Sequence, residues 1–349
     1  MYKLKTNIIK INNPIENHSQ VEEAAALLRS NEVVAFPTET VYGLGANARS
    51  DEAVKKIFEA KGRPSDNPLI IHIANMEMIE ELAEHVPDKA RKLMDAFWPG
   101  PLTLIFPKKE GLSQAATPGL DTVAVRMPDH VLALALIEAA GLPIAAPSAN
   151  LSGKPSPTTA QHVEKDLNGR IRCIVDGGET GVGVESTVVD CTADTPVILR
   201  PGGVTKEEIE RVIGSVSEDP ALHNATDIPK SPGMKYTHYA PNAPFVLVDG
   251  SKELIQQLVN EKRHNGYQVG VLTTEENEGY YDADMVVACG KRQVLETVAA
   301  NLYDALRAFN EGKVDFIYGE MFPNSGIGSA IMNRLLKAAG NSVHRENIE

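Results

Sequence analysis

Cysteine is scarce in this sequence, and its scarcity excludes several kinds of site. The 349 residues include three cysteines, Cys173, Cys191 and Cys289, which lie far apart. No CxxC pair and no Cys/His cluster occurs at the spacing of a zinc site. We therefore expect three buried, reduced thiols, as in most proteins of a reducing compartment.

Long apolar runs are also missing. The most apolar stretch, residues 131–147, is interrupted by Glu138, Gly141 and Pro143. A membrane-spanning helix needs about 20 consecutive apolar residues. Residues 1–14 contain scattered lysines but no apolar core of signal-peptide length. We expect a cytoplasmic protein that makes no contact with a membrane.

Positively charged residues are relatively few: the sequence has 34 lysines and arginines and 47 acidic residues, which gives a net charge of -13. This argues against nucleic-acid binding by a broad basic surface, although a local basic groove remains compatible with it. The contents of 42% hydrophobic and 23% charged residues are near globular averages. A chain of this length predicts one large domain and one smaller domain.

Helix-like and strand-like segments alternate through the first part of the chain. Ser19 with Glu22, and Thr205 with Glu208, have the form of capping boxes and predict helix starts. Residues 51–62 predict another helix, which ends at a glycine. Strands that are mostly apolar on both faces, as in sheets covered by helices, are predicted at residues 32–38, 69–74, 102–107, 122–127, 143–148, 172–177, 186–191 and 196–201.

Residues 215–242 show no helix or strand periodicity and predict a linker between domains 1–214 and 243–349. So long a segment is usually functional or disordered. Its motif SPGMKYTHYAP, residues 231–241, is too distinctive for a spacer. The chain from residue 243 onward alternates strands and helices and predicts a compact α/β domain with a parallel sheet of about four strands.

The motif PTETVYGLGAN, residues 37–47, directly follows a predicted strand. Thr38, Glu39 and Tyr42 place hydroxyl and carboxylate groups at a strand end, where ligands of open α/β sheets usually bind. Gly43 and Gly45 allow close backbone approach. An ordinary Gly-rich turn explains the motif equally well.

In KGRPSDNPL, residues 61–69, Lys61 and Arg63 lie two positions apart near Asn67. Outside a regular helix this spacing allows both cations to bind one polyanion, with the arginine fork suited to phosphate oxygens. Two solvated cations at a helix end are the alternative explanation.

Two further loops carry small polar groups. Ser148 and Asn150 follow a predicted strand in APSANLSGKPSPT, which also has the composition of a simple turn. The glycines ahead of Ser186 in GGETGVGVESTVVD suit backbone amides that cradle an anion. This loop lacks the Gly-Lys-Ser/Thr of a Walker A motif.

Arg126 and Arg200 each end a predicted strand, where a buried unpaired charge would be costly. Phosphate or carboxylate contacts explain them, and so do structural salt bridges. The loops together, all expected at strand ends of one sheet without a metal cage or nucleophilic triad, suit a nucleotide and a small polar substrate. Catalysis would then rest on positioning and electrostatics.

These motifs together resemble the YrdC-like domain, through PTETVYGLGAN, Lys61-x-Arg63, Ser148-x-Asn150, VESTVVD and LRPG. SPGMKYTHYAP and the domain after it resemble the long form of the threonylcarbamoyl-AMP synthase family. The resemblance covers nearly the whole chain. It implies an α/β fold, with a large twisted mixed sheet flanked by helices plus a smaller Rossmann-like parallel α/β domain. Thr237 stands where many relatives have arginine, which puts one phosphate contact in doubt.

The resemblance implies that L-threonine, bicarbonate and ATP are joined into threonylcarbamoyl-adenylate with release of pyrophosphate. A separate transferase complex would then modify an adenosine of tRNA, and direct tRNA contact is expected to be weak. Mg2+ is expected to bind mainly through the ATP phosphates, without protein ligands.

The resemblance also implies which residues form the site. Threonine would be surrounded by Thr38, His72, Arg126, Ser148 and Ser186. The nucleotide would be bound by Lys61, Arg63, Asn67, Thr122, Asn150, Ser156, Arg200, Tyr236 and His238. His72 is equally explained as a core histidine. The linker with Tyr236 and His238 is expected to act as a lid that excludes water.

Three other functions remain as alternatives. The first is a double-stranded RNA or tRNA-binding protein without adenylate chemistry, which the net charge of -13 opposes. The second is the carbamoyl transfer of hydrogenase maturation proteins, whose extra cysteine-rich regions have no counterpart here. The third is a regulatory nucleotide sensor, although the C-terminal part lacks a G-x-G-x-x-G fingerprint.

Overall fold

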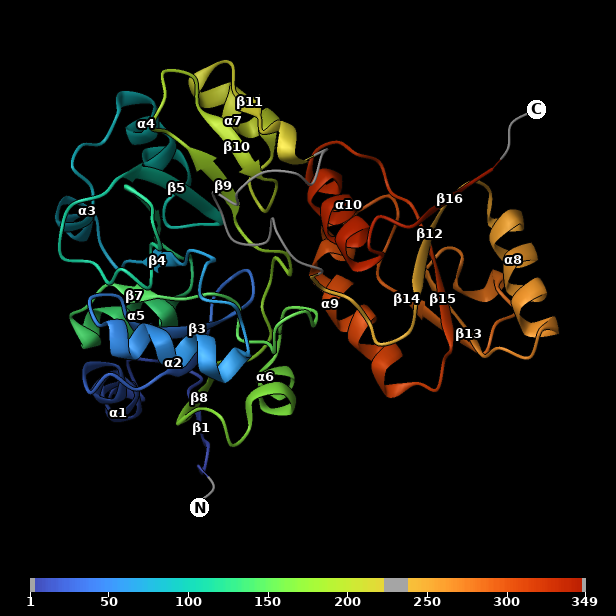
Figure 1. Cartoon of the computed structure of the whole chain (residues 1–349), viewed down its shortest axis with the longest axis horizontal. Helices are drawn as coiled ribbons and strands as arrows, with labels where there is room; N and C mark the ends of the chain where they lie inside the picture. Colours follow the sequence, from blue (N-terminus) through green and yellow to red (C-terminus); the bar gives the residue numbers. More distant parts are fainter. Residues whose placement is uncertain (1–3, 223–237, 347–349) are drawn as a thin grey trace. The chain divides into compact units, whose positions relative to one another are not determined.

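The computed structural model describes residues 4–222 and 238–346 (Figure 1). These residues form two compact units. The first contains the described residues up to 222 apart from two short segments, 153–155 and 182–184. The second contains these two segments and residues 238–346.

The first unit is built on a mixed sheet, as predicted. Among the described residues the strand order is β1 (Asn7–Lys10), β8 (Cys173–Asp176), β2 (Val34–Pro37), β3 (Tyr42–Asn47), β7 (Ile144–Ala145), β4 (Ile70–His72), β6 (Thr122–Arg126), β5 (Leu102–Pro107), β9 (Thr187–Asp190), β10 (Val197–Arg200) and β11 (Ser217–Glu218). β3 is antiparallel to both β2 and β7, and β7 is antiparallel to β4. β4 and β6 are parallel, whereas β5 is antiparallel to β6 and parallel to β9.

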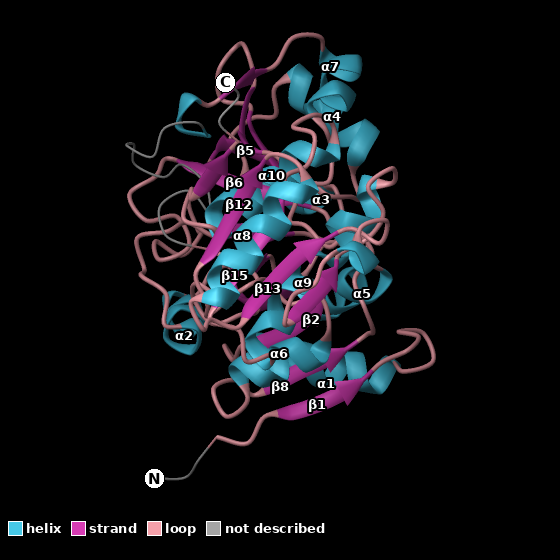
Figure 2. Ribbon diagram, turned by 90° about the vertical axis from the view of Figure 1, so that its right-hand side faces the viewer, coloured by secondary structure: helices cyan, strands magenta, loops and turns pink. Residues whose placement is uncertain are grey.

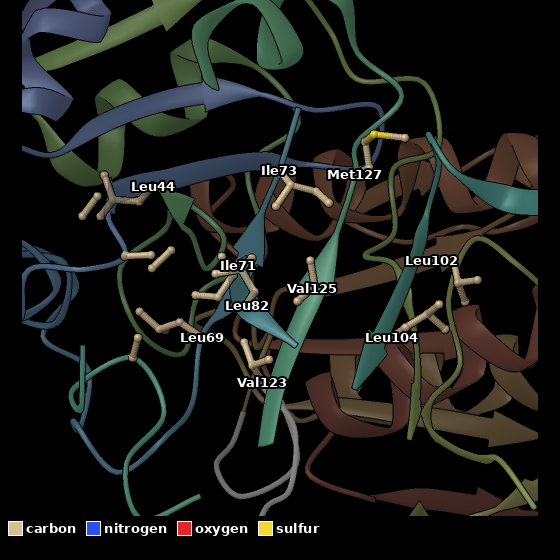
Figure 3. Close-up of a cluster of buried hydrophobic side chains, with 14 of the residues drawn as sticks. Leu44, Leu69, Ile71, Ile73, Leu82, Leu102, Leu104, Val123, Val125 and Met127 are labelled. Carbon is tan, nitrogen blue, oxygen red and sulfur yellow. The ribbon is translucent and has the colours of Figure 1, made fainter. Parts of the chain in front are cut away.

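Helices flank this sheet, and the alternation of strand side chains decides what each face packs against. Val34 and Phe36 pack in a buried cluster with residues of two of the helices, α1 and α5, whereas Ala35 belongs to a second cluster with residues of α2, α4 and α6. Figure 3 shows part of the second cluster, where Ile71 of β4 and Val125 of β6 point together. The helices of the first unit are α1 (His18–Arg29), α2 (Asp51–Lys61), α3 (Glu77–Leu82), α4 (Asp88–Phe97), α5 (Val131–Ala140), α6 (Ala160–Leu167) and α7 (Lys206–Ile213).

One of the two predicted capping boxes is present. Thr205 and Glu208 cap the start of α7 reciprocally. The box predicted at Ser19 is wrong, because α1 already begins at His18 and the Ser19 hydroxyl donates to the side chain of Gln20. A side chain that has a local partner is not available to cap the helix.

The segment 42–47, which has the composition of a Gly-rich loop, forms strand β3 instead. A Cβ atom on Gly45 would lie 2.6 Å from Phe36 Cε1 and 2.7 Å from Ile144 Cγ2. Close packing therefore requires glycine at position 45, as expected from the sequence.

The predicted linker begins with regular structure. β11 pairs with β10 in parallel, and a 3-10 helix η1 (Pro220–Leu222) follows. The expectation that no helix or strand occurs there was wrong at this end. Residues 223–237, which include Tyr236 and Thr237, lie outside the described residues.

The second unit contains a parallel sheet in the order β14 (Met285–Ala288), β13 (Val269–Thr273), β15 (Phe316–Glu320), β12 (Phe245–Asp249) and β16 (Val343–Arg345). α8 (Lys252–His264) packs on β13 and β15, and Figure 2 shows it in front of them. α9 (Leu295–Glu311) and α10 (Ile327–Ala338) lie on the other face (Figure 1), and η2 (Glu278–Tyr280) precedes β14. The sheet has five strands instead of about four, because β16 was not predicted. This strand is short and largely exposed. The predicted parallel α/β unit is otherwise confirmed.

Two global expectations can be compared with these residues. The three cysteines are free and buried, as expected. Within residues 4–222 and 238–346, every helix is too short or too polar to cross a membrane.

Candidate active site

Lys61 lies at the centre of a buried polar cluster. It is the last residue of α2, and its side chain contacts the loop that follows β7. Its Nζ donates to the Asn150 carbonyl at 2.6 Å, to the Ser148 carbonyl, and to Asn150 Oδ1 at 3.3 Å. Ser148 Oγ donates to the same Oδ1 at 2.6 Å. Two motifs that are distant in the sequence therefore form one cluster with a fixed positive charge.

Local sequence explains how this cluster is positioned. Ser50 caps the start of α2, and Gly62 ends the helix in the left-handed conformation with φ 61°. This φ favours glycine, so the helix ends directly after Lys61. The loop after β7 is held against β3, because Leu44 N donates to the Pro147 carbonyl and Ala149 N to the Tyr42 carbonyl, both at 2.8 Å.

Arg126 and His72 form a second part of the site. They are partners in the parallel ladder of β6 and β4, and both are buried. Arg126 Nη2 lies 2.7 Å from Glu39 Oε2, and Arg126 Nε donates to the Gly100 carbonyl at 3.3 Å. Burial and the Arg126 charge lower the pKa of His72 to about 3, so its imidazole is neutral at neutral pH. Because alternate strand residues face opposite ways, both side chains point away from the core formed by Ile71 and Val125.

Ser186 and Arg200 form a third part. Arg200 Nη2 donates to the Ser186 carbonyl at 2.9 Å and to Ser186 Oγ at 3.1 Å, and Ser186 Oγ lies 2.8 Å from Thr103 Oγ1. A Cβ atom on Gly202 would lie 2.3 Å from backbone atoms of residues 185–187. The LRPG motif therefore packs tightly on the backbone that carries Ser186.

These loops were expected at strand ends of one sheet, and the structure places them at both ends of its strands. His72 and Arg126 end β4 and β6 at one end of the sheet. β2 and β7 run in the opposite direction, so Thr38 and Ser148 follow strand ends at the other end. A mixed sheet separates its carboxyl ends in this way. Glu39, next to Thr38, connects the two groups through its ion pair with Arg126.

The remaining predicted residues have varied environments. Thr38 Oγ1 is buried and donates to the Val41 carbonyl at 2.7 Å. Ser156 Oγ donates to Glu185 Oε1 at 2.6 Å. Asn67 is 1% exposed, and among the described residues its amide nitrogen and oxygen have no hydrogen-bond partner. Arg63 is half-buried just after the end of α2.

One predicted residue of the first unit is not brought to these groups. Thr122 begins β6, about 13 Å along the strand from Arg126. Its partner in the sheet ladder is Pro107 of β5. His238 belongs to the second unit, where its ring centroid lies 5.6 Å from that of Tyr239. Tyr236 and most of the predicted lid lie outside the described residues, so the lid stays a prediction.

Glu39, Thr103 and Glu185 contact predicted site residues but were not assigned from the sequence. Glu39 was visible in the PTETVYGLGAN motif as a carboxylate at a strand end. Thr103 lies in an apolar strand with no signal of its own. In the part of the chain that the structure describes, no group of three or more His, Cys, Asp or Glu residues is arranged to hold a metal ion.

Comparison with known proteins identifies the family. Residues 26–202 match the Sua5/YciO/YrdC family model, described as telomere recombination, and residues 204–340 match the model of the threonylcarbamoyl-AMP synthase C-terminal domain. The chain is 65% identical to the threonylcarbamoyl-AMP synthase of Bacillus subtilis over 94% of this chain and 95% of that protein. It is 52% identical to that of Pyrococcus abyssi over 96% of this chain and 98% of that protein.

Solved structures agree with this result. The crystal structure of Pyrococcus abyssi Sua5 complexed with L-threonine has a TM-score of 0.93 and 50% identity, and the match covers 98% of this chain and 100% of that chain. The Escherichia coli YciO structure has a TM-score of 0.51 and 25% identity, and the match covers 57% of this chain and 96% of that chain. The chain therefore belongs to the threonylcarbamoyl-AMP synthase family, in the form with both domains.

Proposed function

We propose that this chain joins L-threonine, bicarbonate and ATP into threonylcarbamoyl-adenylate and releases pyrophosphate. The observation that carries the proposal is the buried Lys61 ammonium held against the Ser148 and Asn150 carbonyls. It places a fixed cation beside hydroxyl and amide groups, which suits phosphate oxygens. Family membership favours this activity over RNA binding, hydrogenase-type carbamoyl transfer or nucleotide sensing.

The proposed threonine end is the group around Arg126. The buried guanidinium suits the carboxylate of an amino acid. Neutral His72 and the hydroxyls of Thr38, Ser148 and Ser186 are proposed to surround the rest of the molecule. The binding of L-threonine by the similar Pyrococcus abyssi protein supports this assignment.

The proposed nucleotide end is the group around Lys61. Arg63, Asn67, Asn150, Ser156 and Arg200 are proposed to contact ATP with it. The buried Asn67 amide, which has no hydrogen-bond partner among the described residues, supports a ligand at this end. Thr122, Tyr236 and His238 keep their predicted roles only as expectations from the sequence.

The proposed reaction has two steps. The threonine amine loses a proton and adds to bicarbonate, and water leaves to give a carbamate. A carbamate oxygen then forms a bond to the α-phosphorus as the bond to pyrophosphate breaks. The site residues hold both reactants in line and exclude water from the reactive product.

Mg2+ is proposed to arrive with ATP. Such an ion takes most of its oxygen ligands from phosphates and water, so it would not require a cage of protein ligands. When bound, it supplies charge neutralisation at the phosphate oxygens.

The product is proposed to pass, in the cytoplasm, to a separate tRNA-modifying transferase complex. The net charge of -13 supports weak direct contact with tRNA. The activity is tested by measuring pyrophosphate release with Mg-ATP while threonine or bicarbonate is omitted in turn. Release that needs both supports the proposal, and release that ignores threonine refutes it.

A further inference from the structure

The Glu39 carboxylate is buried but incompletely satisfied. Its side chain is 12% exposed, and Oε2 lies 2.7 Å from Arg126 Nη2. Among the described residues, no group donates a hydrogen bond of good geometry to either carboxylate oxygen. Buried polar atoms in folded proteins normally have such partners. Both oxygens therefore lack a hydrogen-bond donor in the described chain.

Arg126 has the matching excess of donors. Its side chain is 4% exposed, and Nε donates to the Gly100 carbonyl. Within the described residues Nη2 has no acceptor with hydrogen-bond geometry, although it pairs with Glu39 electrostatically. A guanidinium carries about five N–H donors. The ion pair thus presents unused donors and unused acceptors in one buried place.

The neighbouring titratable groups do not complete the pair. His72 is neutral, because burial and the Arg126 charge lower its pKa to about 3. Burial lowers the pKa of His130, and the nearby charges of Glu39 and Asp129 partly oppose this effect. A ligand that satisfies the pair must therefore bring a positive donor for Glu39 and a negative acceptor for Arg126.

We infer that Glu39 binds the α-ammonium group of threonine while Arg126 binds its carboxylate. The inference rests on the proposed function and adds a residue to it, since the sequence assigns no group to the ammonium. An α-amino acid carries both required charges on adjacent atoms of its backbone. No single anion, and no neutral hydroxy acid, meets both requirements.

Glu39, the ammonium, the carboxylate and Arg126 then form a ring of charges that alternate in sign, each beside an opposite charge. Without substrate, the ion pair keeps Arg126 from being a buried unpaired charge, which would be strongly unfavourable. Glu39 therefore gives selectivity for an amino acid over the same molecule without its amine. A missing ammonium would leave the buried carboxylate without its donor.

The experiment compares two ligands on two proteins. Calorimetric titration of wild type and Glu39→Gln uses L-threonine and (R)-3-hydroxybutanoate, which keeps the carboxylate and hydroxyl but lacks the ammonium. Wild type is expected to bind threonine about tenfold to a hundredfold more tightly than the analogue. Glu39→Gln is expected to lose this preference, through weaker threonine binding and unchanged or tighter analogue binding. Equal weakening of both ligands would show that Glu39 acts only through the local structure and would overturn the inference.

Controls separate this result from unfolding and from failure of the proposed function. Melting temperature and ATP affinity report whether Glu39→Gln is folded, and Glu39→Asp, which keeps the charge, decides the question if it is not. Glu39→Asp is expected to retain part of the preference, and an equal loss for both ligands would overturn the inference. Glu22→Gln removes a similar but exposed pair with Arg29 and is expected to change neither affinity.

The two proposals fail in different ways. Wild-type protein that releases pyrophosphate with threonine, while Glu39→Gln keeps the wild-type preference, overturns only the role of Glu39. Wild-type protein that does not bind threonine overturns both.

Discussion

Lys61 Nζ donates a hydrogen bond to the backbone carbonyl of Asn150 at 2.6 Å, although the two residues lie 89 positions apart. Lys61 is 3% exposed. A buried ammonium is retained only where acceptors compensate for its lost hydration. The fold therefore places a cation at a defined point, against the loop that carries Ser148 and Asn150.

Lys61→Ala removes that cation and its hydrogen bonds to the loop. We expect kcat/KM for ATP in pyrophosphate release to fall about a hundredfold to a thousandfold. Lys56→Ala is the matched control on the same helix, because Lys56 forms partly exposed pairs with Glu32 and Glu52. It is expected to stay within about twofold of wild type. A Lys61→Ala protein with half of the wild-type rate would contradict the assignment.

Asn67→Ala separates binding from stability. Because the amide has no hydrogen-bond partner among the described residues, its removal is expected to leave the melting temperature almost unchanged. ATP affinity, measured by calorimetry, is expected to fall about tenfold. Asn75→Ala is expected to do the opposite, since Asn75 Oδ1 accepts a hydrogen bond from Met78 N at 3.1 Å. A loss of stability with intact ATP binding in Asn67→Ala would make Asn67 purely structural.

The neutral His72 predicts a pH dependence of stability. Its pKa falls from 6.5 to about 3 on folding, so the unfolded chain binds more protons between these values. The contribution of the neutral His72 to the free energy of unfolding is complete above pH 6.5 and is lost as the pH falls toward 3. Between about pH 7 and about pH 5 the free energy of unfolding should drop by about 2 kcal/mol more in wild type than in His72→Gln.

Urea unfolding at these two pH values provides the measurement for His72. His344→Gln is the control, because His344 is exposed, and it should follow wild type. Identical pH dependence in wild type and His72→Gln would show that His72 is not held neutral.

The burial of the three cysteines predicts slow alkylation of their thiols in the native protein. Burial raises the pKa of Cys173, Cys191 and Cys289 to about 12, so very little thiolate exists at neutral pH. Native protein is expected to resist iodoacetamide for hours, and unfolded protein to gain three labels in mass spectrometry. Labelling of any of them within minutes in the native protein would contradict their burial.

Local features of this fold were predictable from the sequence, whereas the pairing and direction of the strands were not. The helix over 51–61 follows from its apolar face and its terminal glycine, and both act within a few residues. The direction of β7 against β4 depends on residues about 70 positions apart. The sequence therefore did not show that Thr38 and His72 lie at opposite ends of the sheet strands. β16 was missed because its three residues, partly or fully exposed, carry no apolar signal.

The same limit applies to the site. Lys61, Ser148 and Arg126 could be selected from motifs, but their contacts depend on how the mixed sheet brings distant loops together. Glu39 was visible as a carboxylate next to Thr38, yet nothing local shows that Arg126 is its partner. Thr103 was hidden because a hydroxyl in an apolar strand has no pattern that separates it from the core.

The most direct test of the synthase activity follows the carbon of bicarbonate. Purified protein is incubated with Mg-ATP, L-threonine and 14C-bicarbonate, and the nucleotides are separated by chromatography. The account predicts a labelled adenylate that requires threonine and ATP, forms in equal amount to pyrophosphate, and is nearly absent with Lys61→Ala. Pyrophosphate release without label in any adenylate would contradict it.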